Sequence, residues 1–221
     1  MSKEYRSDRE TPVGTPVVRA DPTVTGERAA EAVGFDPDDS ESVAEAADVV
    51  HEFATGALGG TDHVLMLRGA AACAALVRGL GSYKAAAEAA GEGVTVSFIR
   101  KWARVHDLPQ SIRRHVARGH IAPTAAKHIA RVSTDDRYLL AWASLDADLT
   151  VRDIRSIASA INSGDDTETA LRNHDVTPGQ LTMTLPRAEY IELRHRASME
   201  NREPGAVVAD ALAAYFGANS E

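Results

Sequence analysis

The sequence predicts a mainly α-helical protein, in which a multi-helix body is followed by a short C-terminal unit of one β-strand and two helices. Apolar residues recur at helical spacing through most of the chain, with interruptions at Gly and Pro. Alanine is frequent while aromatic residues make up only 5%, which favours helices packed through small side chains. Residues 180–185 instead alternate apolar and polar side chains, as a strand does.

Four segments are predicted along the 221 residues. Residues 1–38 contain four prolines and no sustained periodicity, so we expect a disordered N-terminal tail. Residues 39–162 are expected to form the helical domain and 163–178 an acidic linker, with a helical turn at Thr167–Arg172. Residues 179–217 are expected to form the strand–helix–helix module. A chain of this length can bury a substantial core.

The helical domain is predicted to begin with two helices. The first runs to about Ala54 and is capped by an aspartate or serine at 38–40. The second runs from Asp62 to about Arg78, with Thr61 as its N-cap, and is apolar enough to be the central core helix. It holds Cys73, the one cysteine of the chain, which excludes an internal disulfide and fits a small buried apolar side chain.

Two short helices joined by a glycine-containing turn follow. Ser82 is predicted to cap Tyr83–Ala90, and Thr95 to cap Val96–His106, with residues 91–94 as the turn. The pattern over residues 82–106 is typical of a helix-turn-helix, whose second helix enters the major groove of DNA. An ordinary helical hairpin with a solvated charged face would give the same pattern.

The candidate site is the set of polar and cationic residues on and around this motif. Arg can donate two hydrogen bonds to guanine, and residues four apart share a helix face. The expected base-reading residues are Ser97, Arg100, Lys101 and Arg104. Basic helices predicted at Ser111–Arg118 and Pro123–Arg131 would contact phosphates, which positions a protein without reading sequence. The expected phosphate contacts are Lys84, Arg113, Arg114, Arg118 and Lys127.

The remaining helices have clear start signals. One is predicted from about Thr134 to Leu145, and another begins at a capping box formed by Thr150 and Asp153 and runs to about Asn162. In the C-terminal unit, Pro186 ends the strand, and helices are predicted at Arg187–Asn201 and from about Pro204 to Phe216.

A single strand in so small a unit needs a partner, most simply the same strand of a second chain. We therefore expect a homodimer. Its core is expected to contain Leu181, Met183, Leu185, Ile191, Val208 and Leu212. A strand that packs on the protein's own helices is the alternative.

Residues 82–161 resemble the central DNA-binding domain of the ParB family. The features that carry the resemblance occur in the family's order: Tyr83–Ala87, Val96–Lys101, Leu108-Pro109, Val116–Ile121, Thr124–His128 and Leu149–Ile154. The resemblance implies a helix-turn-helix fold that binds DNA. ParB proteins also carry an N-terminal nucleotide-binding domain with a GERR motif, and Gly26–Ala29 matches it only in part, so no nucleotide cofactor is carried over.

The C-terminal unit resembles the ribbon-helix-helix family of MetJ, Arc and CopG. The resemblance implies a dimer in which Gln180, Thr182 and Thr184 face the major groove. The predicted strand departs from a DNA-reading ribbon because it carries no Lys or Arg, although Thr and Gln can contact bases.

Charge is distributed unevenly along a chain of net charge −8. Residues 62–131 carry 11 Lys and Arg against 4 Asp and Glu, and this local positive charge suits a phosphate backbone. Arg outnumbers Lys 20 to 4 and acidic residues are abundant. This composition is typical of halophilic proteins, and a GC-rich genome is the alternative explanation.

Enzyme motifs are absent from the sequence, including the P-loop, GxGxxG, HExxH and GxSxG patterns. We expect no catalytic residue, no metal and no cofactor. Without a signal segment or a run of about 18 apolar residues, the expected location is the cytoplasm, with no membrane partner. The sequence thus predicts a dimeric, sequence-specific DNA-binding protein that acts in transcription regulation or replicon maintenance. A dimeric adaptor that uses the basic face on an acidic protein partner is the alternative.

Overall fold

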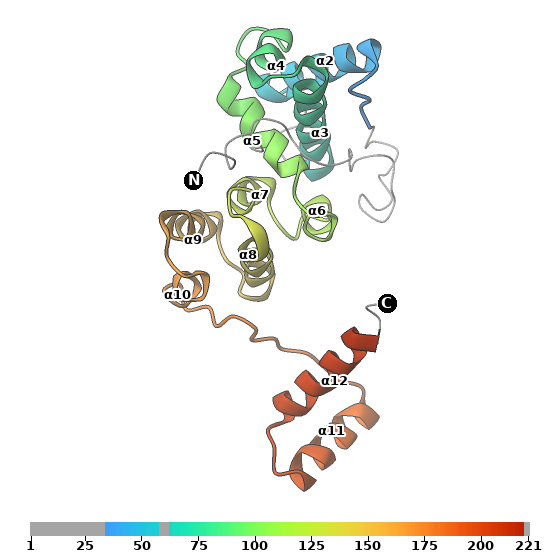
Figure 1. The fold of residues 1–221 in the computed structure, drawn as a ribbon, viewed down its shortest axis with the longest axis vertical. Helices are drawn as coiled ribbons and strands as arrows, with labels where there is room; N and C mark the ends of the chain where they lie inside the picture. The colour runs from blue at the N-terminus through green and yellow to red at the C-terminus, as the bar shows by residue number, and fades with distance from the viewer. Residues whose placement is uncertain (1–33, 58–61, 219–221) are drawn as a thin grey trace, which may run out of the picture. The chain divides into compact units, whose positions relative to one another are not determined.

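The structure is a computed structural model that describes residues 34–57 and 62–218 (Figure 1). Within those residues it contains eleven helices and no β-strand. The chain divides after Gly179 into two compact units. The helices of the first unit are α2 (Ser40–Thr55), α3 (His63–Leu80), α4 (Tyr83–Ala89), α5 (Val96–His106), α6 (Gln110–Ala117), α7 (Pro123–Ile129), α8 (Thr134–Asp146), α9 (Val151–Ser163) and α10 (Thr167–Arg172). The second unit contains α11 (Arg187–Met199) and α12 (Pro204–Ala218).

The first unit is built around α3, which confirms the predicted core helix. Eleven of its 18 residues are buried, and α2, α4, α5, α6 and α7 all pack against it. Small residues from Gly69 to Ala75 let these neighbours approach closely. By length and composition alone α3 could also cross a membrane, a feature that the sequence analysis did not anticipate, but most of the helix is buried in the bundle.

The first two helices begin with side-chain caps. Asp39 accepts a hydrogen bond from the Ser42 N–H at 3.0 Å. Asp62, one residue after the predicted cap, accepts from the N–H groups of Val64 and Leu65 at 2.9 and 3.1 Å; residue 61 lies outside the described residues. The predicted disordered tail lies outside them as far as residue 33. In its described part Phe35 is buried and packs on the body.

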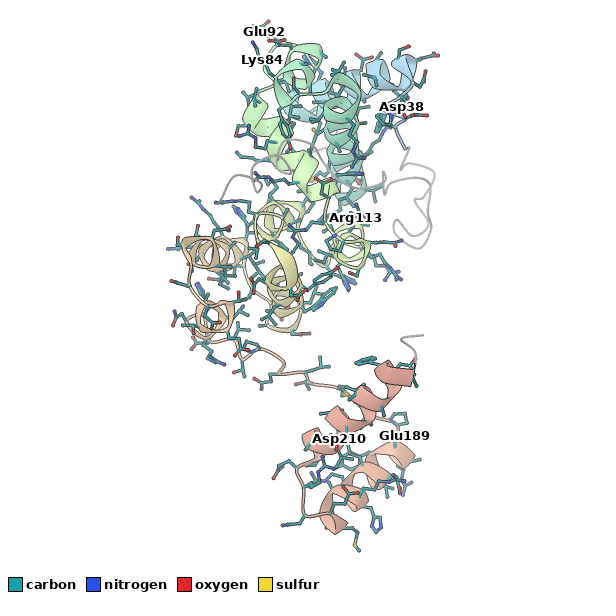
Figure 2. All side chains as sticks on the ribbon, viewed as in Figure 1. Asp38, Lys84, Glu92, Arg113, Glu189 and Asp210 are labelled. Carbon is teal, nitrogen blue, oxygen red and sulfur yellow. The ribbon has the colours of Figure 1, made fainter. Side chains whose placement is uncertain are left out.

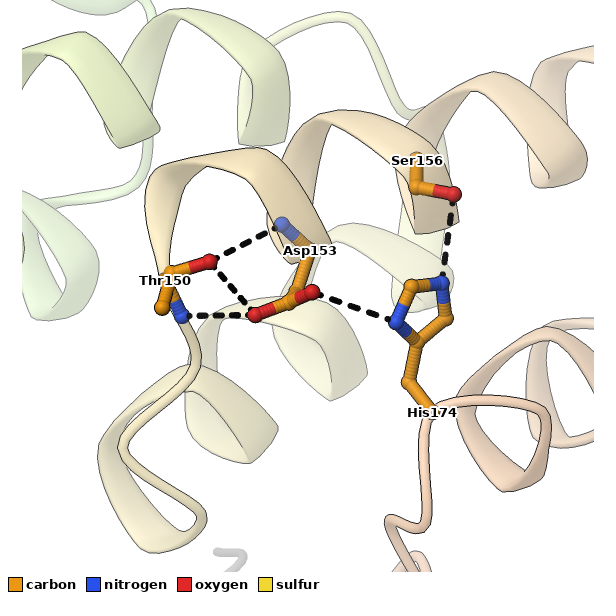
Figure 3. A network of polar contacts seen from close by, with 4 residues as sticks. All are labelled: Thr150, Asp153, Ser156 and His174. Atoms are coloured by element: carbon orange, nitrogen blue, oxygen red, sulfur yellow. Dashed lines mark hydrogen bonds and ion pairs between the residues drawn. The ribbon is translucent and has the colours of Figure 1, made fainter.

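The capping box predicted at the start of α9 is confirmed (Figure 3). The Asp153 N–H donates to Thr150 Oγ1 at 3.3 Å, and the Thr150 N–H donates to Asp153 Oδ2 at 3.1 Å. The other oxygen of Asp153 lies 3.5 Å from His174 Nδ1, and His174 Nε2 lies 3.2 Å from Ser156 Oγ. These contacts join the residues after α10 to α9.

Residues 163–178, which were expected to be a linker, contain α10 and contribute to the packing of the first unit. α10 packs on α8 and α9. Ala170, Leu171 and Val176 are buried, and the Thr167 hydroxyl donates to Asp136 Oδ1 at 2.7 Å. The chain therefore leaves the first unit only after these contacts have been made.

The second unit corrects the predicted fold. Residues 180–185 have no secondary structure, so the expected β-strand is wrong and a ribbon-helix-helix unit is not found. The physical reason is that a strand is held by hydrogen bonds to a neighbouring strand, and no neighbouring strand occurs among the described residues. The two helices are confirmed, with α11 ending two residues earlier and α12 ending two residues later than predicted. They pack on each other, and Ala197 is the one side chain of their described residues that is buried.

Candidate nucleic-acid interface

The helix-turn-helix candidate is formed by α4, a turn and α5. The Ser82 hydroxyl accepts from the Ala85 N–H at 3.1 Å, and the Thr95 hydroxyl accepts from the Phe98 N–H at 3.1 Å, so both predicted caps are confirmed. Between the helices, Gly91 and Gly93 have φ values of 88° and 86°, a region that favours glycine. The turn therefore needs glycine at both positions to bring α4 and α5 together.

The inner face of α5 is fixed in the core. Ile99 and Ala103 are fully buried, and α5 packs extensively on α3. Trp102 is also buried, and its ring centroid lies 4.6 Å from that of Phe53 on α2. Phe98 makes an edge contact with the same Phe53 ring at 5.3 Å. The aromatic cluster of Phe53, Phe98 and Trp102 thus fixes the orientation of α5 relative to α2 and α3.

The outer face of α5 carries the residues that the sequence assigned to base reading. Ser97, Arg100 and Lys101 are exposed, while Arg104 is half-buried. The Arg100 guanidinium lies over the ring of Tyr83 on α4, 5.2 Å from its centroid, a distance at which a cation is attracted to an aromatic face. The four residues share one face of the helix, and Arg104 lies nearest its C-terminal end.

Lys84 lies on α4 and is labelled in Figure 2. Its ammonium group lies 3.7 Å from the Glu88 carboxylate, one helical turn further along. Both side chains are well exposed, so this contact contributes little to stability. Lys84 is available to solvent but already has a carboxylate neighbour.

Arg113, labelled in Figure 2, lies on α6 and is buried. It is only 9% exposed, and its guanidinium donates to the carbonyl oxygen of buried His106. Desolvation by burial lowers the pKa of Arg113 to about 10, against the opposing effect of Asp107. Asp107 also lies 3.6 Å from Arg78, and burial raises its pKa to about 6 despite these cations. Together Arg78, His106, Asp107 and Arg113 join the end of α5 to α3 and α6. Arg113 therefore has a structural role.

Arg114 and Arg118 are exposed on and after α6. Near them, His115 Nδ1 lies 3.1 Å from His120 Nδ1, across the end of α6. Burial, followed by His120, Arg118 and Arg114, lowers the pKa of His115, so its neutral form is favoured. Both exposed arginines remain available for contacts outside the chain.

A second cationic group lies around α7 and α9. Lys127 extends over the ring of Trp102, with Nζ 4.9 Å from the centroid. Burial and Lys101 both lower the pKa of Lys127. Burial also lowers the pKa of His128, and four cations act in the same direction: Arg131, Lys127, Arg155 and Lys101. We call these five residues, Lys101, Lys127, His128, Arg131 and Arg155, the α5–α7–α9 cluster.

Arg155 is the member of this cluster that the sequence analysis missed, and Arg131 was placed only on a generally basic helix. Arg155 follows the capping box in a helix that is far from the helix-turn-helix in sequence. Its proximity to α7 depends on the packing of α7 against α9, which no local pattern reveals. Charge counting alone would not have selected it, because residues 132–221 are acidic overall.

The C-terminal residues that the ribbon-helix-helix resemblance assigned to DNA contact belong to the second unit. Gln180, Thr182 and Thr184 are exposed in a segment without secondary structure. Among the expected dimer-core residues, Leu185 and Val208 are half-buried, and the others are exposed: Leu181, Met183, Ile191 and Leu212.

The described residues offer no group of three or more His, Cys, Asp or Glu side chains that could hold a metal ion. Cys73 is fully buried in α3, and this burial raises the pKa of its thiol, as expected for an apolar role. The features that the geometry does provide are the outer face of α5 and the cations beside it.

A protein-family model described as a family of unknown function, DUF7119, matches residues 36–176. That span takes in α2 to α10 and more than half of the 221 residues. No curated protein and no solved structure matches the chain. The chain therefore belongs to the DUF7119 family.

Proposed function

We propose that this protein binds double-stranded DNA and reads base sequence with α5. The observation that carries the proposal is the division of α5 into two faces. Its apolar face packs on α3, while Ser97, Arg100 and Lys101 are exposed on the other face. The major groove of DNA admits an α-helix and presents acceptor groups to such side chains.

The individual roles follow from the chemistry of each side chain. Arg100 donates two hydrogen bonds to the O6 and N7 atoms of a guanine. Its contact with Tyr83 already restricts the side chain in the free protein, so less conformational entropy is lost on binding. Lys101 and Ser97 contact neighbouring base edges, with Arg104 at the periphery. Arg114 and Arg118 bind phosphates, whereas buried Arg113 holds the α5–α6 corner and takes no part in the interface.

We propose further that the protein is a homodimer, joined through α11 and α12. Of the 15 residues of α12, Asp210 is the one charged side chain, and none is buried. A helix that is apolar on all sides is normally covered, and a unit of about 40 residues rarely has enough core to be stable alone. A second copy supplies matching apolar surface through two-fold symmetry. The residues that it would cover include Ile191, Leu212, Tyr215 and Phe216.

Selection from random DNA duplexes tests both parts of the proposal. The full chain is compared with a Leu212→Asp variant, which introduces a charge into the proposed dimer contact. The expected result is a two-fold-symmetric motif for the wild type and a single half-site, bound by a monomer, for the variant. Sedimentation measured on both proteins gives the oligomeric state independently of DNA.

The outcomes separate DNA binding from the alternative function. If no motif is enriched although the full chain is folded and dimeric, sequence-specific recognition is refuted, and an acidic protein partner for the same cationic face becomes the better explanation. If the wild type is a monomer, the assignment of α11 and α12 to dimerisation is refuted.

A further inference from the structure

The α5–α7–α9 cluster brings cations from three helices, and from a position two residues beyond one of them, to one part of the first unit. Lys101 comes from α5, Lys127 and His128 from α7, Arg131 from just after α7, and Arg155 from α9. α7 packs against both α5 and α9, so the cluster is continuous with the outer face of the proposed recognition helix.

Among the described residues of the first unit, some cations are paired with carboxylates and those of the cluster are not. Four cations outside the cluster lie beside carboxylates: Arg68 with Glu45 at 3.0 Å, Arg78 with Asp107 at 3.6 Å, Lys84 with Glu88 at 3.7 Å and Arg172 with Glu168 at 2.5 Å. Across residues 34–57 and 62–218, no carboxylate is ion-paired with Lys101, Lys127, Arg131 or Arg155. The cluster is therefore not neutralised from within the described chain.

Keeping like charges together is unfavourable, since each cation disfavours the charged form of its neighbours. Burial lowers the pKa values of Lys127 and His128, and the neighbouring cations of the cluster act in the same direction. An anion from outside the chain would relieve the repulsion. A row of cations over several helices suits a polymer of phosphates better than one small anion.

The scaffold beneath the cluster is packed and capped. The ammonium group of Lys127 lies over the ring of Trp102, which is 5% exposed and packed on Phe53. On α9, Ile154 and Ile157 are buried on either side of Arg155 in the sequence, and the capping box fixes the first turn. Arg131 and Arg155 are themselves exposed, so their charged ends can reach a ligand without a change in fold.

We infer that Lys127, Arg131 and Arg155 bind the sugar–phosphate backbone of DNA beside the groove that α5 enters. This inference rests on the proposed function. It adds a second backbone contact, around α7 and α9, to the contact that Arg114 and Arg118 make from α6. Lys101, the member of the cluster on α5, keeps its proposed contact with base edges. Because phosphate contacts fix register without reading sequence, this second contact sets how α5 lies in the groove.

Binding affinity measured against salt concentration tests the inference. The variants are Arg131→Ala, Arg155→Ala and the double variant, and the ligands are the duplex enriched by selection and a scrambled duplex. Arg172→Ala is the matched control, because it removes the same charge from an exposed position of the same unit. Circular dichroism confirms that each variant is folded.

We expect each single substitution to reduce the slope of log affinity against log salt by about 0.9, and the double variant by about twice that. At 0.1 M salt this slope corresponds to a loss of roughly eightfold in affinity for each contact. The loss should be equal on both duplexes, and Arg131→Lys should restore the slope because a point charge suffices for phosphate. Arg172→Ala should bind as the wild type does.

The outcomes distinguish this inference from the function on which it rests. If the wild type binds the enriched duplex but Arg131→Ala and Arg155→Ala leave the slope unchanged, the backbone contact is refuted and the recognition helix stands. If either variant changes the ratio of affinities for the two duplexes while preserving the slope, it reads bases and the assignment is also refuted. If the wild type binds neither duplex, both proposals fail.

Discussion

Gly69 lies where α3 meets the aromatic cluster that orients α5, so replacing it with Ala tests how closely this contact is packed. A Cβ atom at position 69 would lie 2.3 Å from Phe53 Cδ1 and 2.6 Å from Phe53 Cγ. The Phe53 ring would have to retreat by about 1 Å to reach an ordinary contact distance. Its retreat is opposed by Phe98 and Trp102, which contact the same ring.

Two opposing effects set the magnitude. Exchanging Gly for Ala inside a helix stabilises it by about 1 kcal/mol, through the lower backbone entropy of the unfolded chain. Forcing an extra methyl group into a packed contact costs about 1–3 kcal/mol. Because Phe53 is only half-buried, it can move in part, and we expect Gly69→Ala to lower the free energy of unfolding by about 1 kcal/mol net.

Urea denaturation followed by circular dichroism measures this free energy. Gly205→Ala is the matched control, since Gly205 is helical and a Cβ there would meet no atom within 4 Å; it should be neutral or stabilising. In a Phe53→Leu background the penalty of Gly69→Ala should shrink, because the clashing ring is gone. The close packing of α2 on α3 is refuted if Gly69→Ala stabilises the protein as Gly205→Ala does. It is also refuted if the penalty of Gly69→Ala is the same in the wild-type and Phe53→Leu backgrounds.

Four further substitutions test the role of Arg113 against that of Arg114, the cap of α9 and the place of His128. Arg113→Ala should lower the free energy of unfolding by about 2–4 kcal/mol, because it removes a buried charged donor to the His106 carbonyl. Arg114→Ala should lower DNA affinity and leave the free energy of unfolding unchanged. Equal effects of the two substitutions on stability in urea would contradict these roles. Thr150→Ala should cost about 1 kcal/mol by removing the cap of α9, and an unchanged thermal midpoint would contradict the role of the capping box. His128→Gln should flatten the pH dependence of DNA affinity. The pKa of His128 is lowered in the free protein, and neighbouring phosphates would raise it in the complex. Binding therefore takes up a proton, and DNA affinity increases as pH falls through the range between the pKa of the free protein and that of the complex. A wild-type pH profile retained in His128→Gln, measured by fluorescence anisotropy, would show that this histidine is not at the interface.

Most of the helical architecture could be predicted from the sequence because its signals are local. Ser82, Thr95 and Thr150 accept the hydrogen bonds expected of N-caps, and the glycines of the α4–α5 turn have the positive φ values that favour this residue. Apolar spacing identified α3 as the core helix. Each of these features depends on residues within one or two turns of each other.

The predicted strand failed because an alternating pattern is only half of what a strand requires. Residues 180–185 alternate apolar and polar side chains, yet strand formation also depends on a hydrogen-bonding neighbour. The described part of the chain supplies none. A local sequence pattern could not decide this, because pairing is a property of the surroundings of a segment.

The candidate site was predicted in part. The outer face of α5 follows from helical periodicity, and Ser97, Arg100 and Lys101 are exposed as that periodicity requires. Arg113 could have been recognised as inward-facing, because it lies three residues before buried Val116 and next to buried Ile112. Arg155 could not have been found, since only the tertiary packing of α9 on α7 brings it to the cluster.

Arg100 of α5 is the side chain proposed to read base edges. The most direct measurement is the ratio of dissociation constants for the enriched and scrambled duplexes, determined for the wild type and for Arg100→Ala at one potassium concentration. Since a bidentate contact to guanine contributes about 1–3 kcal/mol of discrimination, we predict that the ratio falls by roughly 5- to 150-fold in the variant. An unchanged ratio, with both proteins folded and both duplexes bound, would contradict the account.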